Sequence, residues 1–144
     1  MKPGLGKSCD ESMTAPPFGG RALVVFGGDT ALPWLRMLKP GFRHCFVLVE
    51  RAGGWVVVNP LSHQTELAWL ERREAGDLAN AYRRHGFRVV PYAVIAAPPT
   101  AAPWRPYTCV EAVKRVLGIH HRWVWTPWAL YRHIRGARTQ KNTY

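Results

Sequence analysis

The sequence predicts an α+β domain in which an antiparallel sheet of about four strands packs against a helix that begins with a cysteine. Two observations lead to this fold class. Runs of β-branched and aromatic residues lie at 22–26, 42–58 and 87–95, each bounded by glycine or proline. Segments with helix-cap residues at their starts follow these runs, most clearly at 108–118 and 126–134.

The length of 144 residues suits a single domain, since domains cluster near about 100–150 residues. We place this single domain over residues 21–135. Residues 1–20 are rich in Gly, Pro and Ser and are predicted to be a flexible N-terminal segment. Residues 136–144 are predicted to form a basic C-terminal tail.

The chain is strongly basic, with 20 Lys and Arg against nine Asp and Glu, a formal net charge of +11. This balance favours an anionic neighbour such as an acidic polymer or an acidic protein face. Specific nucleic-acid binding is not expected, because the charges are scattered and no zinc-finger spacing, RNA-binding motif or leucine heptad occurs. No apolar stretch approaches the ~20 residues that span a bilayer. The first 20 residues lack the apolar middle of a signal peptide.

The first predicted strand is Ala22–Phe26, which two glycines end. Residues 29–41 are predicted to form a short helix or turn, with Asp29 or Thr30 as its cap. This segment therefore connects the first strand to the hairpin that follows.

The clearest supersecondary signal is a β-hairpin over residues 42–60, which turns near Ala52-Gly53. A turn at that point pairs Glu50 with Trp55. Both strands are apolar at nearly every position, so we expect both faces of the sheet to be covered.

Residues 65–86 are predicted to form one or two helices, with Asp77 as a cap and Gly86 as the end. The strand that follows contains Pro91, which favours an edge position or a bulge. The last helix is predicted to begin at Thr126-Pro127, with the threonine as N-cap and the proline as first helical residue.

The most informative stretch is "YTCVEAVKRVLG". Thr108 followed three residues later by Glu111 predicts a capping box, in which each side chain bonds the other residue's backbone N–H. Cys109 is then the first residue of a helix that ends at Gly118. A thiol at a helix N-terminus is biased toward thiolate. The alternative is a packing cysteine, since free cysteine is among the most buried residue types.

A nucleophilic cysteine needs a base, and His44 is the candidate because it begins an apolar strand. With the hairpin turn at Ala52-Gly53, His44 shares a sheet face with Asn59, which could orient the imidazole. A turn one residue longer would place Asn59 on the other face and make Ser62 or His63 the orienting residue. The other histidines lie in predicted loops or beside arginines: His63, His85, His120, His121 and His133.

Each of these assignments has a structural alternative. His44 could be a half-buried residue at a strand end, and Asn59 precedes a proline, which is common where a strand ends in a turn. A metal site built from His44, Cys45 and Cys109 is disfavoured, because adjacent strand residues point to opposite faces and no Cys-x-x-Cys occurs. No metal or cofactor is therefore predicted.

The three cysteines, at positions 9, 45 and 109, have no regular spacing and do not indicate a disulfide framework. Cys45 should point to the apolar face opposite His44, where burial disfavours the thiolate. Cys9 lies in the predicted flexible segment and should behave as an ordinary thiol.

The stretches "GFRHCFVLVE" and "YTCVEAVKRVLG", in this order, resemble the circularly permuted papain-like hydrolases, relatives of the NlpC-type amidases that include the lecithin retinol acyltransferase group. The resemblance covers about residues 21–135 in element order. It implies that Cys109 is the nucleophile, His44 the base and Asn59 the orienting residue. The chain departs from the pattern at Asn59, where the acyltransferase group has His, and at Thr108, where the family has Asn.

The chain also resembles small proteins of bacterial viruses in which Phe-Arg-His-Cys and Cys-Val-x-x-Val-Lys recur. These resemblances imply a cysteine hydrolase or acyl transferase that acts through an acyl-enzyme on an amide or ester, in the bacterial host cytoplasm or the virion. Its substrate would be a peptide, a peptidoglycan-like polymer or another virion protein. The alternative is a non-catalytic structural component of a virus particle with a degenerate papain-like fold.

Overall fold

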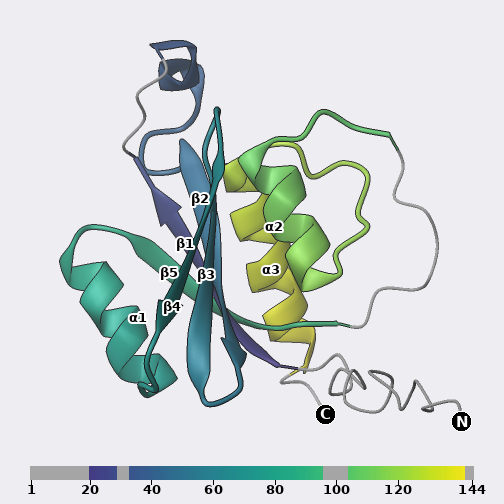
Figure 1. Cartoon of the computed structure of the whole chain (residues 1–144). Helices are drawn as coiled ribbons and strands as arrows, with labels where there is room; N and C mark the ends of the chain where they lie inside the picture. Colours follow the sequence, from purple (N-terminus) through teal and green to yellow (C-terminus); the bar gives the residue numbers. More distant parts are fainter. Residues whose placement is uncertain (1–19, 29–32, 96–103, 142–144) are drawn as a thin grey trace, which may run out of the picture.

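The computed structural model describes residues 20–28, 33–95 and 104–141. In this part of the chain, five antiparallel strands form one open sheet in the order β4-β3-β2-β1-β5 (Figure 1). The strands are β1 (Arg21–Gly27), β2 (His44–Arg51), β3 (Gly54–Pro60), β4 (Thr65–Leu70) and β5 (Arg88–Ala93). The α+β class is confirmed, with one strand more than expected.

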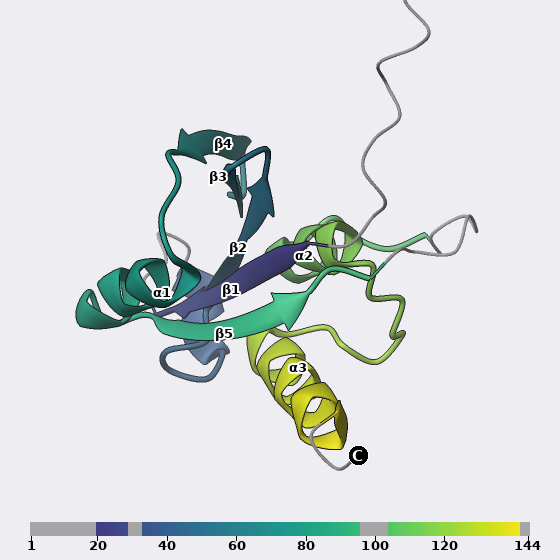
Figure 2. The same ribbon diagram turned by 90° about the horizontal axis from the view of Figure 1, so that it is seen from below.

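Helices cover both faces of this sheet. They are α1 (Ala75–Arg84), α2 (Cys109–Leu117) and α3 (Pro127–Lys141), and a short 3-10 helix, η1 (Pro33–Met37), follows β1. Helix α1 lies on one face and α2 with α3 on the other, as the view in Figure 2 shows. The helix that begins with the cysteine therefore packs directly on the sheet, as the sequence predicts.

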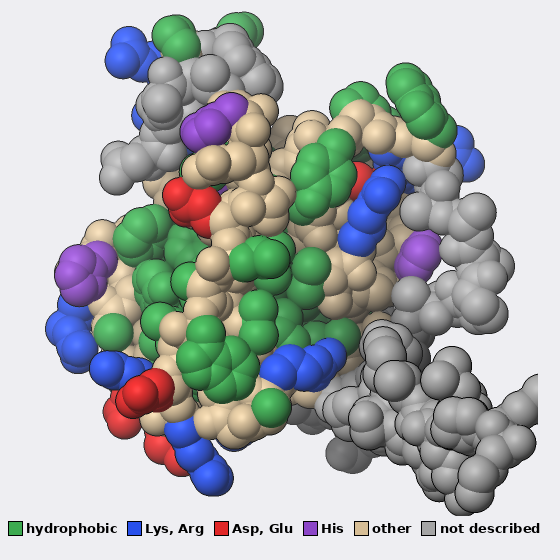
Figure 3. All heavy atoms as spheres, in the orientation of Figure 1, with side chains coloured by type: hydrophobic (Ala, Val, Ile, Leu, Met, Phe, Trp, Pro, Cys, Tyr) green, Lys and Arg blue, Asp and Glu red, His purple; other side chains and the backbone are tan. Residues whose placement is uncertain are grey.

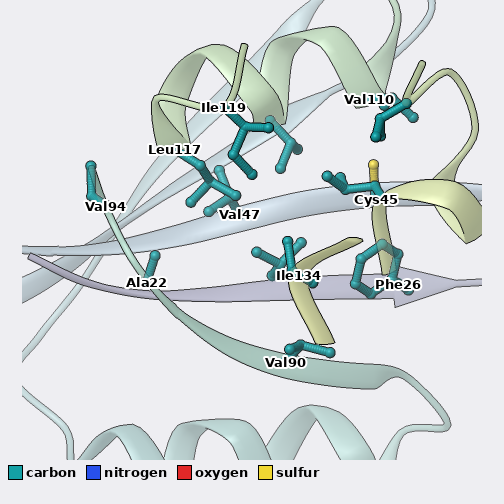
Figure 4. Packing of buried hydrophobic residues seen from close by; sticks show 14 of the residues in the cluster. Ala22, Phe26, Cys45, Val47, Val90, Val94, Val110, Leu117, Ile119 and Ile134 are labelled. Atoms are coloured by element: carbon teal, nitrogen blue, oxygen red, sulfur yellow. The ribbon is translucent and has the colours of Figure 1, made fainter. Parts of the chain in front are cut away.

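The alternation of side chains along β2 builds two separate hydrophobic clusters. Cys45, Val47 and Val49 point to the face that α2 and α3 cover, where Figure 4 shows Val47 beneath Leu117 and Ile119. The intervening residues of β2 pack with Trp55 beneath α1. Both faces of β2 are buried, and this is why nearly every residue of the strand is apolar.

The β2–β3 hairpin has the predicted register. Glu50 pairs with Trp55, and the two turn residues Ala52 and Gly53 have φ of 44° and 79°. Positive φ at both turn positions is typical of the two-residue turn whose twist matches that of the strands.

The predicted helix at 65–86 is wrong in its first part. Residues 65–70 form strand β4, which pairs with β3 from Trp55–Leu70 to Pro60–Thr65. Helix α1 begins only at Ala75, and Asp77 lies in its first turn and is not its cap. The pairing with β3 overrides a local composition that suits either structure.

Other expectations at the ends of elements are confirmed. Pro91 lies on the edge strand β5, and Gly86 adopts φ of 84° just after α1. The Thr126 hydroxyl caps α3 by accepting a hydrogen bond from the backbone N–H of Ala129 at 3.2 Å. Helix α3 continues to Lys141, beyond the predicted boundary at residue 135.

Two expectations fall on residues outside the described ranges: the flexible N-terminal segment with Cys9, and the caps Asp29 and Thr30.

Candidate active site

The site lies at one end of the sheet, where β2 and α2 both begin (Figure 1). Thr108 has an extended backbone, and its hydroxyl accepts a hydrogen bond from the backbone N–H of Glu111 at 3.2 Å. Helix α2 consequently starts at Cys109, and Gly118, with φ of 73°, ends it. The thiol therefore lies in the first turn of a helix, where the positive end of the helix dipole favours a thiolate.

The second half of the predicted capping box is wrong. The Glu111 carboxylate accepts hydrogen bonds from Lys114 at 3.1 Å and Arg115 at 3.2 Å. Burial alone would raise the pKa of Glu111, but these two cations hold it below its ordinary value. Lys114 is 2% exposed, and its ammonium also donates to the carbonyl of Val124 at 3.5 Å. Lys114 therefore links Glu111 of α2 to the segment that leads into α3.

His44 connects the cysteine to Asn59. Its Nε2 atom lies 2.7 Å from Oδ1 of Asn59, as the hairpin register predicted. The ring is also hydrogen-bonded to the Cys109 side chain, and Nδ1 is the nitrogen left for that contact. The three predicted site residues are therefore brought together in the order Cys109, His44, Asn59.

Cys45 is a further neighbour of Cys109 that the sequence did not predict. It is fully buried, and in Figure 4 its sulfur points toward the first turn of α2, near Val110. Its side chain and its backbone N–H both hydrogen-bond to Cys109. Burial raises the pKa of Cys45 well above its ordinary value, so this thiol stays protonated and acts as a donor. The contact is possible because Cys109 lies across the start of β2 and reaches residues of both faces.

These contacts shift the acid–base equilibrium of the pair. The hydrogen bond from Cys45 contributes most to lowering the pKa of Cys109, which reaches about 5 against the opposing effect of burial, and His44 contributes next. Burial alone would lower the pKa of His44, but its hydrogen bonds with Cys109 and Asn59 raise it overall. A thiolate beside an imidazolium is therefore the favoured state between these two pKa values.

Glu66 extends the hydrogen-bonded chain by one residue. It lies opposite Asn59 in the β3–β4 ladder, and its Oε2 accepts a hydrogen bond from Nδ2 of Asn59 at 2.9 Å. Glu66 was not among the predicted site residues, because residues 65–70 were predicted to be helical. The sequence carries no clear strand signal here, because Leu67, Ala68, Trp69 and Leu70 form a continuous apolar run with no alternation.

The alternative orienting residues do not occupy this position. Ser62 and His63 are exposed in the turn between β3 and β4. Three other histidines have contacts elsewhere, since His85 bonds the carbonyl of Ala81 and the rings of His121 and His133 lie 4.9 Å apart.

Trp104, in the segment that leads into α2, points into solvent and does not cover Cys109. Trp104 is 92% exposed, and Cys109 is partly exposed. Figure 3 shows hydrophobic side chains protruding at the upper right, where Figure 1 places this segment. Arg105 links it to the loop before α3, because its guanidinium lies 5.1 Å from the Trp125 ring. The segment that leads into the candidate nucleophile thus carries exposed aromatic side chains and a cationic side chain.

Among the described residues, no three His, Cys, Asp or Glu side chains are grouped so that they could hold a metal ion. None of the helices in the described ranges is long and apolar enough to cross a membrane.

Comparison with known proteins yields no relative: no protein-family model, curated protein or solved structure matches this chain. The geometry of the site and the motifs in the sequence are therefore what indicate a function.

Proposed function

We propose that this chain is a cysteine hydrolase or acyl transferase with a permuted papain-like arrangement, in which Cys109 is the nucleophile, His44 the general acid and base, and Asn59 the orienting residue. The observation that carries the proposal is the position of His44 between Asn59, to which its Nε2 is hydrogen-bonded, and Cys109, with whose side chain it interacts. The order of these residues along the chain, histidine first and cysteine last, supports the permuted pattern.

The chemistry begins with the ion pair. The Cys109 thiolate attacks the carbonyl carbon of an amide or ester, and the carbonyl oxygen becomes an oxyanion. The backbone N–H of Cys109, at the start of α2, is a donor suited to that oxyanion. Collapse of the tetrahedral intermediate breaks the bond to the leaving group, which takes a proton from His44 and departs.

The acyl-enzyme is then released by a second nucleophile. His44, now neutral, takes a proton from water or from an acceptor hydroxyl or amine, and that nucleophile attacks the thioester. Expulsion of the Cys109 thiolate regenerates the ion pair with a protonated His44. Water as nucleophile gives hydrolysis, and another acceptor gives acyl transfer.

The substrate class under this proposal is a peptide or peptidoglycan-like amide, or a virion protein. The net charge of +11 suits an anionic polymer, and this choice also follows the resemblance to proteins of bacterial viruses. Catalysis would occur in the bacterial host cytoplasm or in the virion.

An activated ester tests the proposal without knowledge of the natural substrate. With p-nitrophenyl acetate, we expect a burst of nitrophenolate and an acetyl group on the Cys109 peptide. Cys109→Ala should abolish both, and His44→Ala should slow acylation by about 10²–10⁴-fold, as is typical of a lost general acid–base. His85→Ala is a matched control, since that ring bonds only to the backbone of its own helix in the described contacts. Ester cleavage that persists in Cys109→Ala would contradict the assignment.

The competing hypothesis is a structural virion component that retains an idle Cys–His pair. It predicts the same fold and the same ion pair, but no acyl-enzyme. The exposed aromatic side chains of Trp104 and Trp125 are compatible with a protein contact at this surface. A reactive thiolate with no acetylation by esters or peptides would favour this hypothesis over catalysis.

A further inference from the structure

The amide of Asn59 is held from both sides. Its Oδ1 faces Nε2 of His44 at 2.7 Å, and its Nδ2 faces the Glu66 carboxylate at 2.9 Å. A side-chain amide has one accepting and one donating end, whereas an ionised carboxylate only accepts. Glu66 therefore requires the NH₂ end of Asn59, which leaves the oxygen for His44.

This orientation determines which nitrogen of His44 carries the proton. Because the Asn59 oxygen accepts, Nε2 of His44 must donate, and the neutral ring then has its lone pair on Nδ1. Nδ1 is the atom left to face Cys109 and to take its proton. The opposite orientation of the amide would present a donor to Nε2 and disfavour both this tautomer and the imidazolium.

We propose that Glu66 is a positioning residue, which holds the Asn59 amide and, through it, the His44 imidazole in the form that Cys109 requires. This inference rests on the proposed function of the Cys109–His44 pair. The register supports it, because Glu66 and Asn59 are direct partners in the β3–β4 ladder and the contact needs no rearrangement of either strand. Glu66 reaches the reacting thiol only through two other side chains.

The test compares substitutions that keep, remove or reverse the acceptor. Glu66→Gln retains an accepting oxygen, Glu66→Ala removes it, and Glu66→Lys replaces it with a donor that favours the reversed amide of Asn59. Thr65→Lys is the control for the introduced lysine, because it places the same ammonium group one residue away on the opposite face of β4. Its charge change of one unit matches that of Glu66→Gln and Glu66→Ala. Thermal unfolding of each variant checks that the fold is retained.

The main measurement is the rate of Cys109 labelling by iodoacetamide against pH. At pH ~6, we expect Glu66→Gln and Thr65→Lys to label within about twofold of the parent. Glu66→Ala and Glu66→Lys should label at least about threefold more slowly. The reason is that each unit of rise in the pKa of the Cys109 thiol lowers the thiolate fraction by up to tenfold. Nitrogen NMR of the His44 ring above its pKa should show the proton on Nε2 in the parent and a loss of that preference in Glu66→Lys.

The outcomes separate this inference from the proposed function. If His44→Ala slows labelling but Glu66→Ala and Glu66→Lys match the parent, the positioning role is wrong and the Cys–His pair stands. Equal slowing in Glu66→Gln and Glu66→Lys would overturn the role too, because charge and not the acceptor would be responsible. If His44→Ala itself leaves labelling unchanged, the proposed function fails. Should Glu66→Lys not fold, the comparison of Glu66→Gln with Glu66→Ala decides.

Discussion

The Cys45 side chain donates a hydrogen bond to the sulfur of Cys109, so that a fully buried cysteine of β2 supports the partly exposed cysteine that begins α2. The arrangement gives the two thiols opposite properties. Burial raises the pKa of Cys45, whereas the donated hydrogen bond lowers the pKa of Cys109 to about 5. The neighbouring thiol is therefore part of what makes Cys109 acidic.

Replacement of Cys45 should raise the pKa of Cys109. Cys45→Ala removes the side-chain donor and leaves the backbone N–H, so we expect the pH midpoint of Cys109 labelling to move upward from about 5. Cys45→Ser keeps a donor of similar size and should move it less. Iodoacetamide labelling followed by peptide mass measures both variants. Identical profiles for Cys45→Ala and the parent would show that the contact does not act on the thiolate.

Loss of His44 should shift the same profile independently. In the parent, Cys109 should label at pH ~6, whereas Cys9 should become reactive only as the pH rises. His44→Ala removes a hydrogen bond and a positive charge, so the pKa of Cys109 should rise and its labelling at pH ~6 should fall. If Cys9 labels before Cys109 at pH ~6, then Cys109 is a packing residue and the hydrolase proposal fails.

The hairpin turn offers a test of backbone strain. Ala52 is exposed and has φ of 44°, a region that costs an L-residue about 1 kcal/mol or more. Ala52→Gly removes this strain, but glycine also loses more backbone entropy than alanine when the chain folds. Because the strain is the larger of the two, we expect the free energy of unfolding to rise by about 0.5 kcal/mol. Gly53→Ala is the control. Gly53 has φ of 79°, and an added Cβ would have no neighbouring atom within 4 Å. Its expected loss of about 1 kcal/mol in the free energy of unfolding therefore comes from backbone strain alone. Chemical denaturation measures both, and a destabilised Ala52→Gly would contradict this account.

The sequence predicted the parts of the site that depend on local chemistry. Thr108 caps α2 because its hydroxyl satisfies a backbone N–H three residues away, and this relation is visible as a spacing. The pairing of His44 with Asn59 followed from the hairpin turn, since the turn fixes the register of both strands. These predictions required only neighbouring segments of the chain.

The parts that the sequence missed depend on contacts between distant segments. Glu66 became visible as a partner of Asn59 only once residues 65–70 were found in a strand. Cys45 was expected on a buried face, and its contact with Cys109 depends on how α2 docks across the start of β2. The burial of Lys114 beside Glu111 depends on how α2 packs against the segment before α3, which no local spacing shows.

The ion pair between Glu111 and Lys114 should contribute to stability mainly through the penalty for breaking it. Glu111→Ala leaves the 2%-exposed ammonium of Lys114 without its carboxylate, and removal of one partner of a buried pair costs about 3–5 kcal/mol. Lys114→Met with Glu111→Leu removes both charges and should be close to neutral. Denaturant unfolding of the three proteins measures this difference.

The pH dependence of stability provides a second, independent measurement of the same pair. The pKa of Glu111 is lowered in the folded protein, so its contribution is complete above the unfolded value of about 4.3 and is lost as the pH falls through the lower folded value. The parent should therefore lose more stability than Lys114→Met with Glu111→Leu when the pH falls below about 4.3. If the double variant shows the same acid sensitivity, Glu111 is not the group that titrates. A mild effect of Glu111→Ala, below about 1 kcal/mol, would further mean that Lys114 reaches solvent when its partner is removed.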